Sequence, residues 1–496
     1  IPYKRGDIKD RNGNVLATSV MVYNLIIDSK VVMSNEKYLT PTVNALVKYF
    51  DFNEDDLRTA IKERKNNSYW VAKKNLECKD IQKFESYLNY EYADTKEEET
   101  TVQNTKGIWF EKKYKRMYPY NDLACSLLGF ANSDNSATIG IESSYNSFLQ
   151  GTDGREYGYM DSDNNMETVI KDAKDGDNIV SSIDMNIQRI VQKSIKKYMK
   201  KYSPKRISVV IANPNNGEIL TMADDTTFDL NNPYKLIYET DNNISAKEKQ
   251  KLLNKMWRNQ CINDTYEPGS TFKVVTATAA LEEGVVTIDS KFNCPGFKIV
   301  EDRKIRCHKI TGHGSEDFLH GTMNSCNPVF IEVGLKVGAK NFYKYLGKLG
   351  LLNRTGIDIP GEASTIIHKI QNVGEVELAT MSFGQSFQIT PMQYLVAASA
   401  VVNGGTLVTP HFAVKSENAD NKLVEKFQYK SQSNAISKNT SETMKFILEK
   451  VVSEGTGSKG QVPGFKVGGK TATSQKLPRG SGRYIASYMS FAPADK

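Results

Sequence analysis

Three short motifs occur in a fixed order along this chain of 496 residues. They are Ser270-Thr271-Phe272-Lys273, then Ser325-Cys326-Asn327, then Lys470-Thr471-Ala472-Thr473. Each motif is short enough to arise by chance when it is taken alone. About 55 residues separate the first serine from the second, and about 145 separate the second serine from the third motif. If the motifs act together, the fold must bring three distant segments to one place.

The first motif stands at the start of a predicted buried helix. Glu267-Pro268-Gly269 is typical of the residues before a helix, and an apolar run over residues 274–281 ends at Glu282-Glu283-Gly284. Ser270 would lie in the first turn, where free backbone N–H groups stabilise a developing anion. Ser270 and Lys273 are three residues apart, so we expect both side chains on one helix face within hydrogen-bond reach. An ordinary capped core helix would have the same residues.

The first two motifs contain the parts of a serine nucleophile and its base. A serine hydroxyl is a poor nucleophile at neutral pH and needs an adjacent base. Lys273 can serve if burial and neighbouring positive charge lower its pKa. Ser325 can relay a proton between the reacting centre and a lysine, and Asn327 can hydrogen-bond a substrate amide. Taken alone, the second motif is explained more simply as a polar turn before Pro328.

The third motif is expected to lie on an edge strand. Residues 462–469 before it are predicted to form a strand, and residues 484–491 are predicted to return as the second strand of a hairpin. Residues 474–483 between them are rich in turn formers. An edge strand bearing Lys470 and Thr471 can bind a carboxylate and pair with an extended peptide.

Together the three motifs resemble the active site of a class B penicillin-binding protein, a D,D-transpeptidase that cross-links peptidoglycan stem peptides. The resemblance covers nearly the whole chain and is weakest around residues 40–105 and 228–256. One position departs from the family, because Ala472 stands where its third motif usually has glycine. The added methyl group could narrow the groove for bulky β-lactams. The other segments that resemble the family are Arg5–Gly13, Leu16-Ala17, Arg116–Pro119, Leu128–Phe130, Gly140–Glu142, Asp184–Gln188, Gly384–Ser386 and Ile389–Pro391.

The resemblance implies an α+β fold with two domains. Residues 1–177 are expected to form an elongated pedestal, similar to the family's non-catalytic dimerisation domain. Residues 178–496 are expected to form a penicillin-binding transpeptidase domain, in which helices flank an antiparallel sheet. A chain of this length is expected to form more than one core.

Local patterns add detail to these two regions. Asn216-Gly217 lies between two strand-like segments and predicts a hairpin, which we expect to join the later hairpin in one sheet. Residues 95–105 are acidic and polar and are expected to form a mobile loop. Residues 229–256 are rich in Asn and Lys and are expected to be a surface insertion with a short helix.

The resemblance also implies a reaction. Ser270 would attack the penultimate D-Ala carbonyl of a donor stem peptide, with Lys273 as the general base, and β-lactams would stop at the acyl-enzyme. Ser325 would pass a proton to the leaving D-Ala, and Asn327 would orient the peptide. The residues implied to hold the terminal carboxylate are Lys470, Thr471 and Thr473.

Alternatives remain open for this function. A D,D-carboxypeptidase or a β-lactamase would use the same residues with water as the acceptor, although the long pedestal argues against both. A non-catalytic scaffold for cell-wall synthesis is a different class, and the intact motifs argue against it. The resemblance further implies a membrane glycosyltransferase and other wall-synthesis proteins as partners.

Charge and hydropathy limit which partners and which location the sequence predicts. The 65 basic and 58 acidic residues give a net charge of +7 without long basic blocks, which does not indicate nucleic-acid binding. The sequence has no run of about 18 apolar residues, so it predicts no transmembrane helix. The family carries one N-terminal membrane anchor just before the first matching segment. We therefore expect an anchor outside this chain, a catalytic domain on the outer side of the cell membrane, and a catalytic domain that is incomplete at its C-terminus.

Half of the six cysteines fall in one short window together with a histidine. Three thiolates and one imidazole complete a tetrahedral structural zinc site with no open position. Some class B relatives carry a zinc site in this same stretch, and the resemblance therefore favours zinc here. Nearby glycines at 296, 312 and 314 would help the chain turn around an ion. The four predicted ligands are Cys294, Cys307, His313 and Cys326.

Two alternatives to a zinc site stay open for these cysteines. Two of them could form a disulfide in an oxidising compartment. All three could be small buried apolar side chains instead. His308 is the main rival to His313 as a ligand, but adjacent residues rarely both point at one ion.

Overall fold

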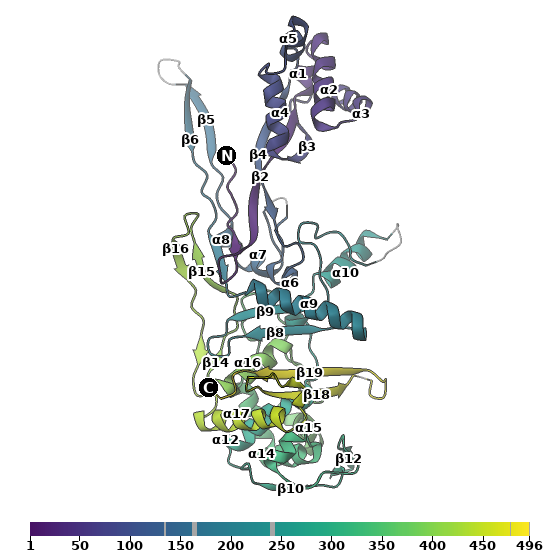
Figure 1. Ribbon diagram of the computed structural model, residues 1–496, viewed down its shortest axis with the longest axis vertical. Coiled ribbons are helices and arrows are strands. Elements are labelled where there is room, and N and C mark those ends of the chain that lie inside the picture. The colour runs from purple at the N-terminus through teal and green to yellow at the C-terminus, as the bar shows by residue number, and fades with distance from the viewer. Residues whose placement is uncertain (133–134, 161–165, 239–243, 477, 496) are drawn as a thin grey trace.

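The computed structural model describes residues 1–132, 135–160, 166–238, 244–476 and 478–495. The molecule is elongated, with the first strands and helices at one end and the elements that carry the three motifs at the other (Figure 1). Helices and strands alternate along the chain, and most strand pairs are antiparallel. The expected α+β class, with an elongated N-terminal region before the catalytic helices, is confirmed.

The N-terminal region is built around one long strand, β2 (Val15–Ile27). It pairs antiparallel with β1 (Ile8–Lys9), β3 (Trp70–Leu76) and β4 (Ile108–Met117). Apolar side chains such as Leu25 point from β2 into a core under the first helices. These helices are α1 (Ser29–Val32), α2 (Glu36–Phe50), α3 (Glu54–Glu63), α4 (Cys78–Leu88) and α5 (Lys96–Gln103).

Residues 95–105 do not form the loop that their composition predicted, because most of them belong to α5. The Thr95 hydroxyl accepts a hydrogen bond from the Glu98 N–H at 3.2 Å, and the Glu98 carboxylate accepts one from the Thr95 N–H at 3.0 Å. This reciprocal capping box satisfies two free donors of the first turn, and acidic residues there favour the helix dipole. Val102 is buried on the inner face of α5. The acidic stretch is therefore a capped amphipathic helix.

A buried ion pair network ties the N-terminal segment to the rest of the pedestal. The Glu142 carboxylate accepts hydrogen bonds from Arg5 Nε at 2.8 Å and from Arg116 Nε at 2.6 Å. It also accepts one from the Tyr118 hydroxyl at 3.0 Å.

The shorter elements of this region are α6 (Cys125–Leu128), α7 (Gly140–Ser144), α8 (Asn146–Leu149), β5 (Arg155–Met160) and β6 (Met166–Lys171).

One sheet crosses the expected boundary between residues 177 and 178. Strand β7 (Asn178–Ser181) pairs parallel with β1 and antiparallel with β15 (Ala413–Glu417), which in turn pairs with β16 (Leu423–Lys426). The strand order is β16-β15-β7-β1-β2-β3, and β4 also pairs with β2. Backbone hydrogen bonds therefore join the pedestal directly to the catalytic region.

The catalytic region, residues 178–496, contains more helix than strand. Its N-terminal part contains α9 (Met185–Tyr202), β8 (Ser208–Ala212), β9 (Ile219–Asp224), α10 (Ala246–Met256), α11 (Gln260–Asn263), η1 (Gly269–Phe272) and α12 (Lys273–Glu282). Its middle part contains β10 (Lys291–Cys294), β11 (Phe297–Val300), β12 (Arg303–Arg306), β13 (Gly314–Asp317), α13 (Phe318–Met323), α14 (Asn327–Lys348), η2 (Ile370–Asn372) and α15 (Glu375–Met381). Its last part contains α16 (Pro391–Val402), β14 (Leu407–Val408), β17 (Ser431–Gln432), α17 (Lys438–Ser453), η3 (Ser458–Gly460), β18 (Gly468–Gln475) and β19 (Tyr484–Phe491).

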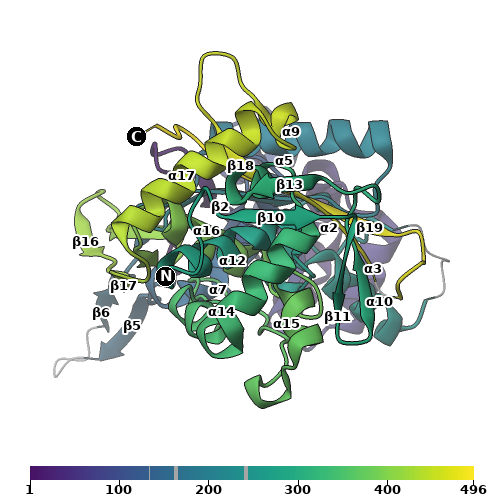
Figure 2. The ribbon, with the colours of Figure 1, turned by 90° about the horizontal axis from the view of Figure 1, so that it is seen from below.

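Helix α12 lies at the centre of this region, with α14, α16 and α17 around it (Figure 2). Its first eight residues are all buried, and they include Val274, Val275 and Ala279. This packing explains why the apolar run predicted a core helix, which ends before Gly284 as expected. The core of the catalytic region therefore holds the helix that directly follows Ser270.

Two expectations about strands are corrected. Hairpins β8–β9 and β18–β19 both form, but no ladder joins one to the other within the described residues. The strand before the third motif begins only at Gly468, so residues 462–467 all lie outside it. Pro463 cannot donate to a ladder and Gly464 adopts φ +84°, so this segment turns back on itself and forms only an isolated bridge between Val462 and Phe465.

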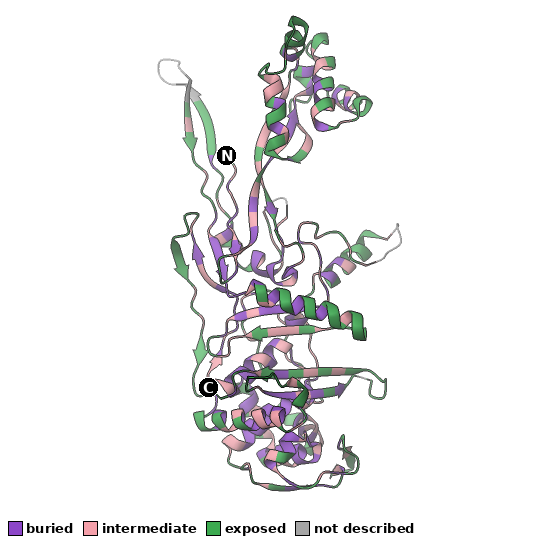
Figure 3. Ribbon diagram, in the orientation of Figure 1, coloured by how far each residue is buried: buried purple, intermediate pink, exposed green. Residues whose placement is uncertain are grey.

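Figure 3 shows the outward face of α9 as exposed, and the helices around α12 as a mixture of buried, intermediate and exposed residues. The insertion expected at residues 229–256 contains the short helix α10, while residues 239–243 of it lie outside the described residues. Within the described ranges, no helix is both long enough and apolar enough to cross a membrane.

Candidate functional site

Ser270 lies in a tight 3₁₀ turn, η1, directly before α12. Gly269 begins this turn at φ +57°, and a Cβ added there would lie 1.9 Å from Ser474 Oγ on β18. Its N–H donates to Gly384 O at 2.9 Å. Only glycine fits this left-handed position between strand β18 and the 384–386 segment. The backbone around Gly269 therefore fixes the position of Ser270, which is half-buried.

Lys273 is fully buried at the start of α12. Its Nζ donates to Ser325 O at 2.7 Å and to Asn327 Oδ1 at 2.7 Å, and it lies 3.3 Å from Ser325 Oγ. Burial lowers the pKa of Lys273 to about 7, so a large share of this amine is neutral near neutral pH. Among the described residues no hydrogen bond joins Lys273 to Ser270. The first motif is thus bonded to the second through Lys273.

Ser325 lies between two buried lysines. Its Oγ accepts a hydrogen bond from Lys470 Nζ at 2.9 Å and faces Lys273 on the other side. Its backbone adopts φ +54°, a conformation that is strained for serine and is concentrated at functional sites. Burial and then the charge of Lys273 hold the pKa of Lys470 well below its usual range. The hydroxyl of Ser325 is therefore placed to pass protons between two amines.

The third motif presents two faces of β18. Lys470, Ala472 and Ser474 are buried on one face, while Thr471 is half-buried and Thr473 is exposed on the other. This alternation follows from the period of two in a strand. The Ala472 methyl group packs near Gly269, since a Cβ added to Gly269 would lie 3.5 Å from it. The departure from the usual family motif is therefore buried against the turn that carries Ser270.

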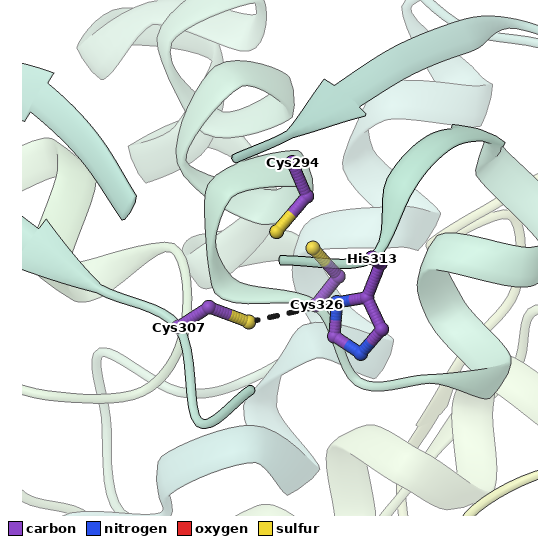
Figure 4. A group of neighbouring side chains, drawn as sticks. All are labelled: Cys294, Cys307, His313 and Cys326. Atoms are coloured by element: carbon purple, nitrogen blue, oxygen red, sulfur yellow. Dashed lines mark hydrogen bonds between the residues drawn. The ribbon is translucent and has the colours of Figure 1, made fainter. Parts of the chain in front are cut away.

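A second cluster lies beside the second motif, formed by Cys294, Cys307, His313 and Cys326 (Figure 4). Their ligand atoms all lie within 4.8 Å of one another. Cys307 Sγ lies 3.7 Å from His313 Nδ1, the ring nitrogen that faces the sulfurs. Two zinc–sulfur bonds of about 2.3 Å at a tetrahedral angle place sulfurs about 3.8 Å apart. The four residues fit a zinc ion with inward shifts of about 1 Å or less.

The fold brings these four residues together through short strands and two glycines. Strand β10 pairs with β13, which places Cys294 opposite Gly314, next to His313. A Cβ on Gly296 would lie 2.0 Å from Ile310 O, and one on Gly312 would lie 2.2 Å from Cys294 O. The predicted need for glycine at these two turns is therefore supported by close backbone contacts.

The alternatives for these cysteines can be compared with the structure. All six cysteines are free thiols, so no disulfide joins any two of them. His308 is exposed and its Nδ1 lies 3.8 Å from Cys307 Sγ, but it is not among the four clustered ligand atoms. Cys326 is the N-cap residue of α14, between Ser325 and Asn327. The cluster therefore shares a backbone segment with the second motif.

Comparison with known proteins identifies the family. Residues 207–496 match the penicillin-binding protein transpeptidase domain, and residues 1–181 match the penicillin-binding protein dimerisation domain. Stage V sporulation protein D of Bacillus subtilis is 33% identical, over 99% of this chain and 72% of that protein. The chain belongs to the class B penicillin-binding proteins.

Other relatives agree with this membership. The peptidoglycan D,D-transpeptidase FtsI of Buchnera aphidicola is 24% identical, over 98% of this chain and 79% of that protein. The crystal structure of penicillin-binding protein 3 of Mycobacterium tuberculosis with aztreonam covers 100% of this chain and 88% of that one. Its TM-score is 0.70 at 21% identity, so it shows that this penicillin-binding protein has the same fold.

Sequence reasoning missed one contact of this penicillin-binding protein. Glu267, three residues before Ser270, forms an ion pair with Arg479 in the connection between β18 and β19. The two residues are 212 positions apart, and no motif in the sequence links them. Only the turn-rich character of residues 474–483 indicated that this connection lies near the third motif.

Proposed function

We propose that this protein is a serine D,D-transpeptidase that cross-links peptidoglycan stem peptides through an acyl-enzyme on Ser270. The observation that carries the proposal is the chain of contacts from Lys273 to Ser325 to Lys470. It lies beside the turn of Ser270, which requires glycine at position 269. Two buried amines with lowered pKa values flank one hydroxyl, which suits proton transfer near neutral pH. Membership of the class B penicillin-binding proteins supports the same reaction.

The first half of the reaction forms the acyl-enzyme. Neutral Lys273 takes the proton of Ser270, whose Oγ forms a bond to the penultimate D-Ala carbonyl carbon. The negative charge on the carbonyl oxygen is stabilised by the backbone N–H groups of Ser270 and Thr473. The C–N bond to the terminal D-Ala then breaks, and the leaving amine takes a proton from the Ser325 hydroxyl. Protonated Lys273 then returns its proton to Ser325, so Lys273 is neutral again before the acceptor arrives.

The second half of the reaction transfers the acyl group. An amine from a neighbouring stem peptide attacks the acyl carbon and gives its proton to Lys273. The bond to Ser270 Oγ breaks, and Lys273 gives this proton to Oγ, which restores the hydroxyl and the neutral amine. Asn327 orients the donor amide, while Lys470, Thr471 and Thr473 of β18 hold the carboxylate that leaves with D-Ala.

A covalent label tests the nucleophile. Benzylpenicillin carries a reactive amide that resembles the donor, and a relative of this fold has been crystallised with the β-lactam aztreonam. Intact-mass measurement should find one penicilloyl adduct per chain, which Ser270→Ala removes. Labelling that survives in Ser270→Ala would overturn the assignment of the nucleophile.

The acceptor separates this function from its alternatives. Incubation with a stem pentapeptide and a second peptide amine should give a cross-linked dimer as the main product. Shortened tetrapeptide alone would indicate a D,D-carboxypeptidase, and fast release of hydrolysed penicillin would indicate a β-lactamase. If Ser270→Ala supports cell-wall synthesis in vivo as well as the wild type does, a scaffold role is the better explanation.

The cysteine cluster is proposed to bind one structural Zn²⁺. The residues that would hold it are Cys294, Cys307, His313 and Cys326, whose spacing and burial suit a closed tetrahedral ion. When bound, zinc supplies structural stabilisation and no reactive water, because four protein ligands leave no open position. The chain's own contribution is to place Cys326 directly between Ser325 and Asn327.

Elemental analysis tests the metal site. We expect one zinc per chain, reduced in Cys294→Ser and unchanged in Cys78→Ser, which removes an exposed thiol far from the cluster in sequence. Chelation should lower the unfolding temperature together with the rate of penicillin acylation. A metal-free protein with full activity and stability would refute the site.

The surroundings of the catalytic region form a further part of the proposal. Residues 1–177 are proposed to act as a pedestal that sets residues 178–496 away from an anchored end, on the outer side of the cell membrane. A membrane glycosyltransferase is the proposed partner of the pedestal. Protease added to intact cells that carry the full-length protein should digest the catalytic region. Protection of that region until the membrane is opened would contradict this placement.

A further inference from the structure

Glu267 joins three segments at one end of the candidate active site. Its Oε1 accepts hydrogen bonds from the Ser386 N–H and from Arg479 Nη2, both at 2.9 Å. Its Oε2 lies 2.9 Å from the same guanidinium nitrogen. One carboxylate therefore connects the segment before Ser270, the 384–386 segment and the connection that follows β18.

The two charged side chains are held in place on both sides. The side chain of Glu267 is 9% exposed and that of Arg479 is 36% exposed, so the carboxylate is the better shielded partner. Arg479 Nη1 also donates to Gln475 O, the last residue of β18, at 2.5 Å. Ser386 adopts φ +67°, so its N–H is aimed at Glu267 by a constrained backbone. Charge-assisted hydrogen bonds of this kind are stronger and more directional than neutral ones.

The direction of β18 places this ion pair on the acyl side of a bound donor. In the proposed reaction Lys470, Thr471 and Thr473 hold the terminal carboxylate, and the reacting carbonyl lies at Ser270 with its oxygen at the Thr473 N–H. The turn of Ser270 packs against Ala472 and Ser474, because these residues line the position of a Cβ on Gly269. An extended donor paired with β18 therefore continues past Thr473 toward Gln475. Arg479 meets the strand at Gln475.

We propose that the Glu267–Arg479 ion pair forms the end wall of the subsite for the acyl portion of the donor. The wall limits the size of the acyl substituent that can lie between β18 and the 384–386 segment. The inference rests on the proposed transpeptidase function and adds the residues that determine specificity on this side. Neither residue contacts the reacting atoms. Both are positioning residues, because they limit where the acyl substituent of the donor can lie.

The test compares two penicillins that share a ring system and differ in acyl substituent. Benzylpenicillin has a compact substituent, and piperacillin has a much larger one. For each compound, rapid mixing separates the dissociation constant of the non-covalent complex from the first-order rate constant of acylation. The variants are Arg479→Ala and Glu267→Gln, where the second keeps the shape of the side chain and an acceptor for Ser386. Arg483→Ala is the control, because Arg483 lies in the same connection and has no described ion pair.

Removing the ion pair should change the dissociation constant of piperacillin and not that of benzylpenicillin. In Arg479→Ala, the dissociation constant for piperacillin should fall at least about tenfold, the scale of one or two methylene groups of extra room. The constants for benzylpenicillin should stay within about twofold, and Glu267→Gln should shift the ratio in the same direction. Arg483→Ala should leave the ratio unchanged.

The outcomes distinguish this inference from the function beneath it. Equal changes for both penicillins in Arg479→Ala, or the same selectivity change in Arg483→Ala, would overturn the end wall alone. If Glu267→Gln leaves the ratio at the wild-type value while Arg479→Ala shifts it, the pair is not the determinant and the inference is also overturned. If the wild type forms no adduct with benzylpenicillin, the acyl-enzyme proposal fails and the inference fails with it.

Discussion

The pH dependence of acylation is the sharpest test of Lys273. Burial lowers its pKa from an ordinary value of 10.5 to about 7. The neutral amine is the form that takes the Ser270 proton, so the acylation rate should follow the neutral fraction. Half of the amine is neutral at pH 7, about 10% at pH 6 and about 1% at pH 5. An unshifted lysine would still be less than about 0.1% neutral at pH 7.

Stopped-flow measurement with a fluorescent penicillin between pH 5 and pH 9 gives this profile. We expect the acylation rate to rise about tenfold per pH unit below pH 7 and to level off above pH 8. Lys273→Ala should lower the plateau by roughly two to four orders of magnitude and remove the inflection near pH 7. Lys459→Ala, which changes an exposed lysine on η3, should keep both the plateau and the inflection.

Two results would refute this reasoning. A rate that still rises about tenfold per pH unit up to pH 9 would mean that burial does not lower the pKa of Lys273 in the functional protein. An inflection near pH 7 that persists in Lys273→Ala would assign the base role to another group. Lys470 is the first candidate then, because burial also lowers its pKa and it contacts Ser325.

Other substitutions test the supports of the site. Gly269→Ala should lower acylation by about a hundredfold in the same assay without abolishing folding, because its Cβ would clash with Ser474 Oγ and shift the turn of Ser270; unchanged acylation would refute the need for glycine. Ala472→Gly should speed acylation by a cephalosporin with a large side chain more than acylation by benzylpenicillin, and equal changes would remove the steric argument. Burial raises the pKa of Glu142, but Arg116 and Arg5 outweigh it and leave the pKa lowered, so this group stabilises the fold above about pH 4 and loses that contribution as the pH falls. Glu142→Gln should lower the free energy of unfolding at pH 7 by about 3–5 kcal/mol in urea titration, and a change below about 1 kcal/mol would contradict a structural role for the network.

Local patterns predicted several elements of the catalytic region. The apolar run before Gly284 predicted α12, and Asn216-Gly217 predicted the β8–β9 hairpin, because burial and turn geometry are local properties. The acidic stretch at residues 95–105 was wrongly assigned to a loop. Its capping box depends on Thr95 and Glu98 at the right spacing, and composition alone does not reveal that spacing.

The contacts within the candidate site were harder to predict. Spacing predicted Ser270 and Lys273 on one helix face, but the hydrogen bonds of Lys273 go to Ser325 and Asn327, more than fifty residues away. The positive φ of Ser325, which lies between α13 and α14, has no local signal, since serine rarely adopts it. The ion pair of Glu267 with Arg479 is equally non-local. The motifs therefore predicted the candidate reacting groups, whereas the contacts between them depend on the fold.

The position of Cys326 gives a physical reason for a metal centre beside the catalytic motif. Ser325 holds a strained backbone conformation, and such strain persists only where the surroundings over-determine it. Part of that constraint comes from the hydrogen bonds of Ser325 N–H to Thr322 O at 3.0 Å and of Cys326 N–H to Gly321 O at 2.8 Å. A bond from Cys326 Sγ to an ion would fix the next residue from the side-chain direction as well. Because a misplacement of about 1 Å can lower a rate about a hundredfold, an ion there would act on catalysis through the position of Ser325 and Asn327.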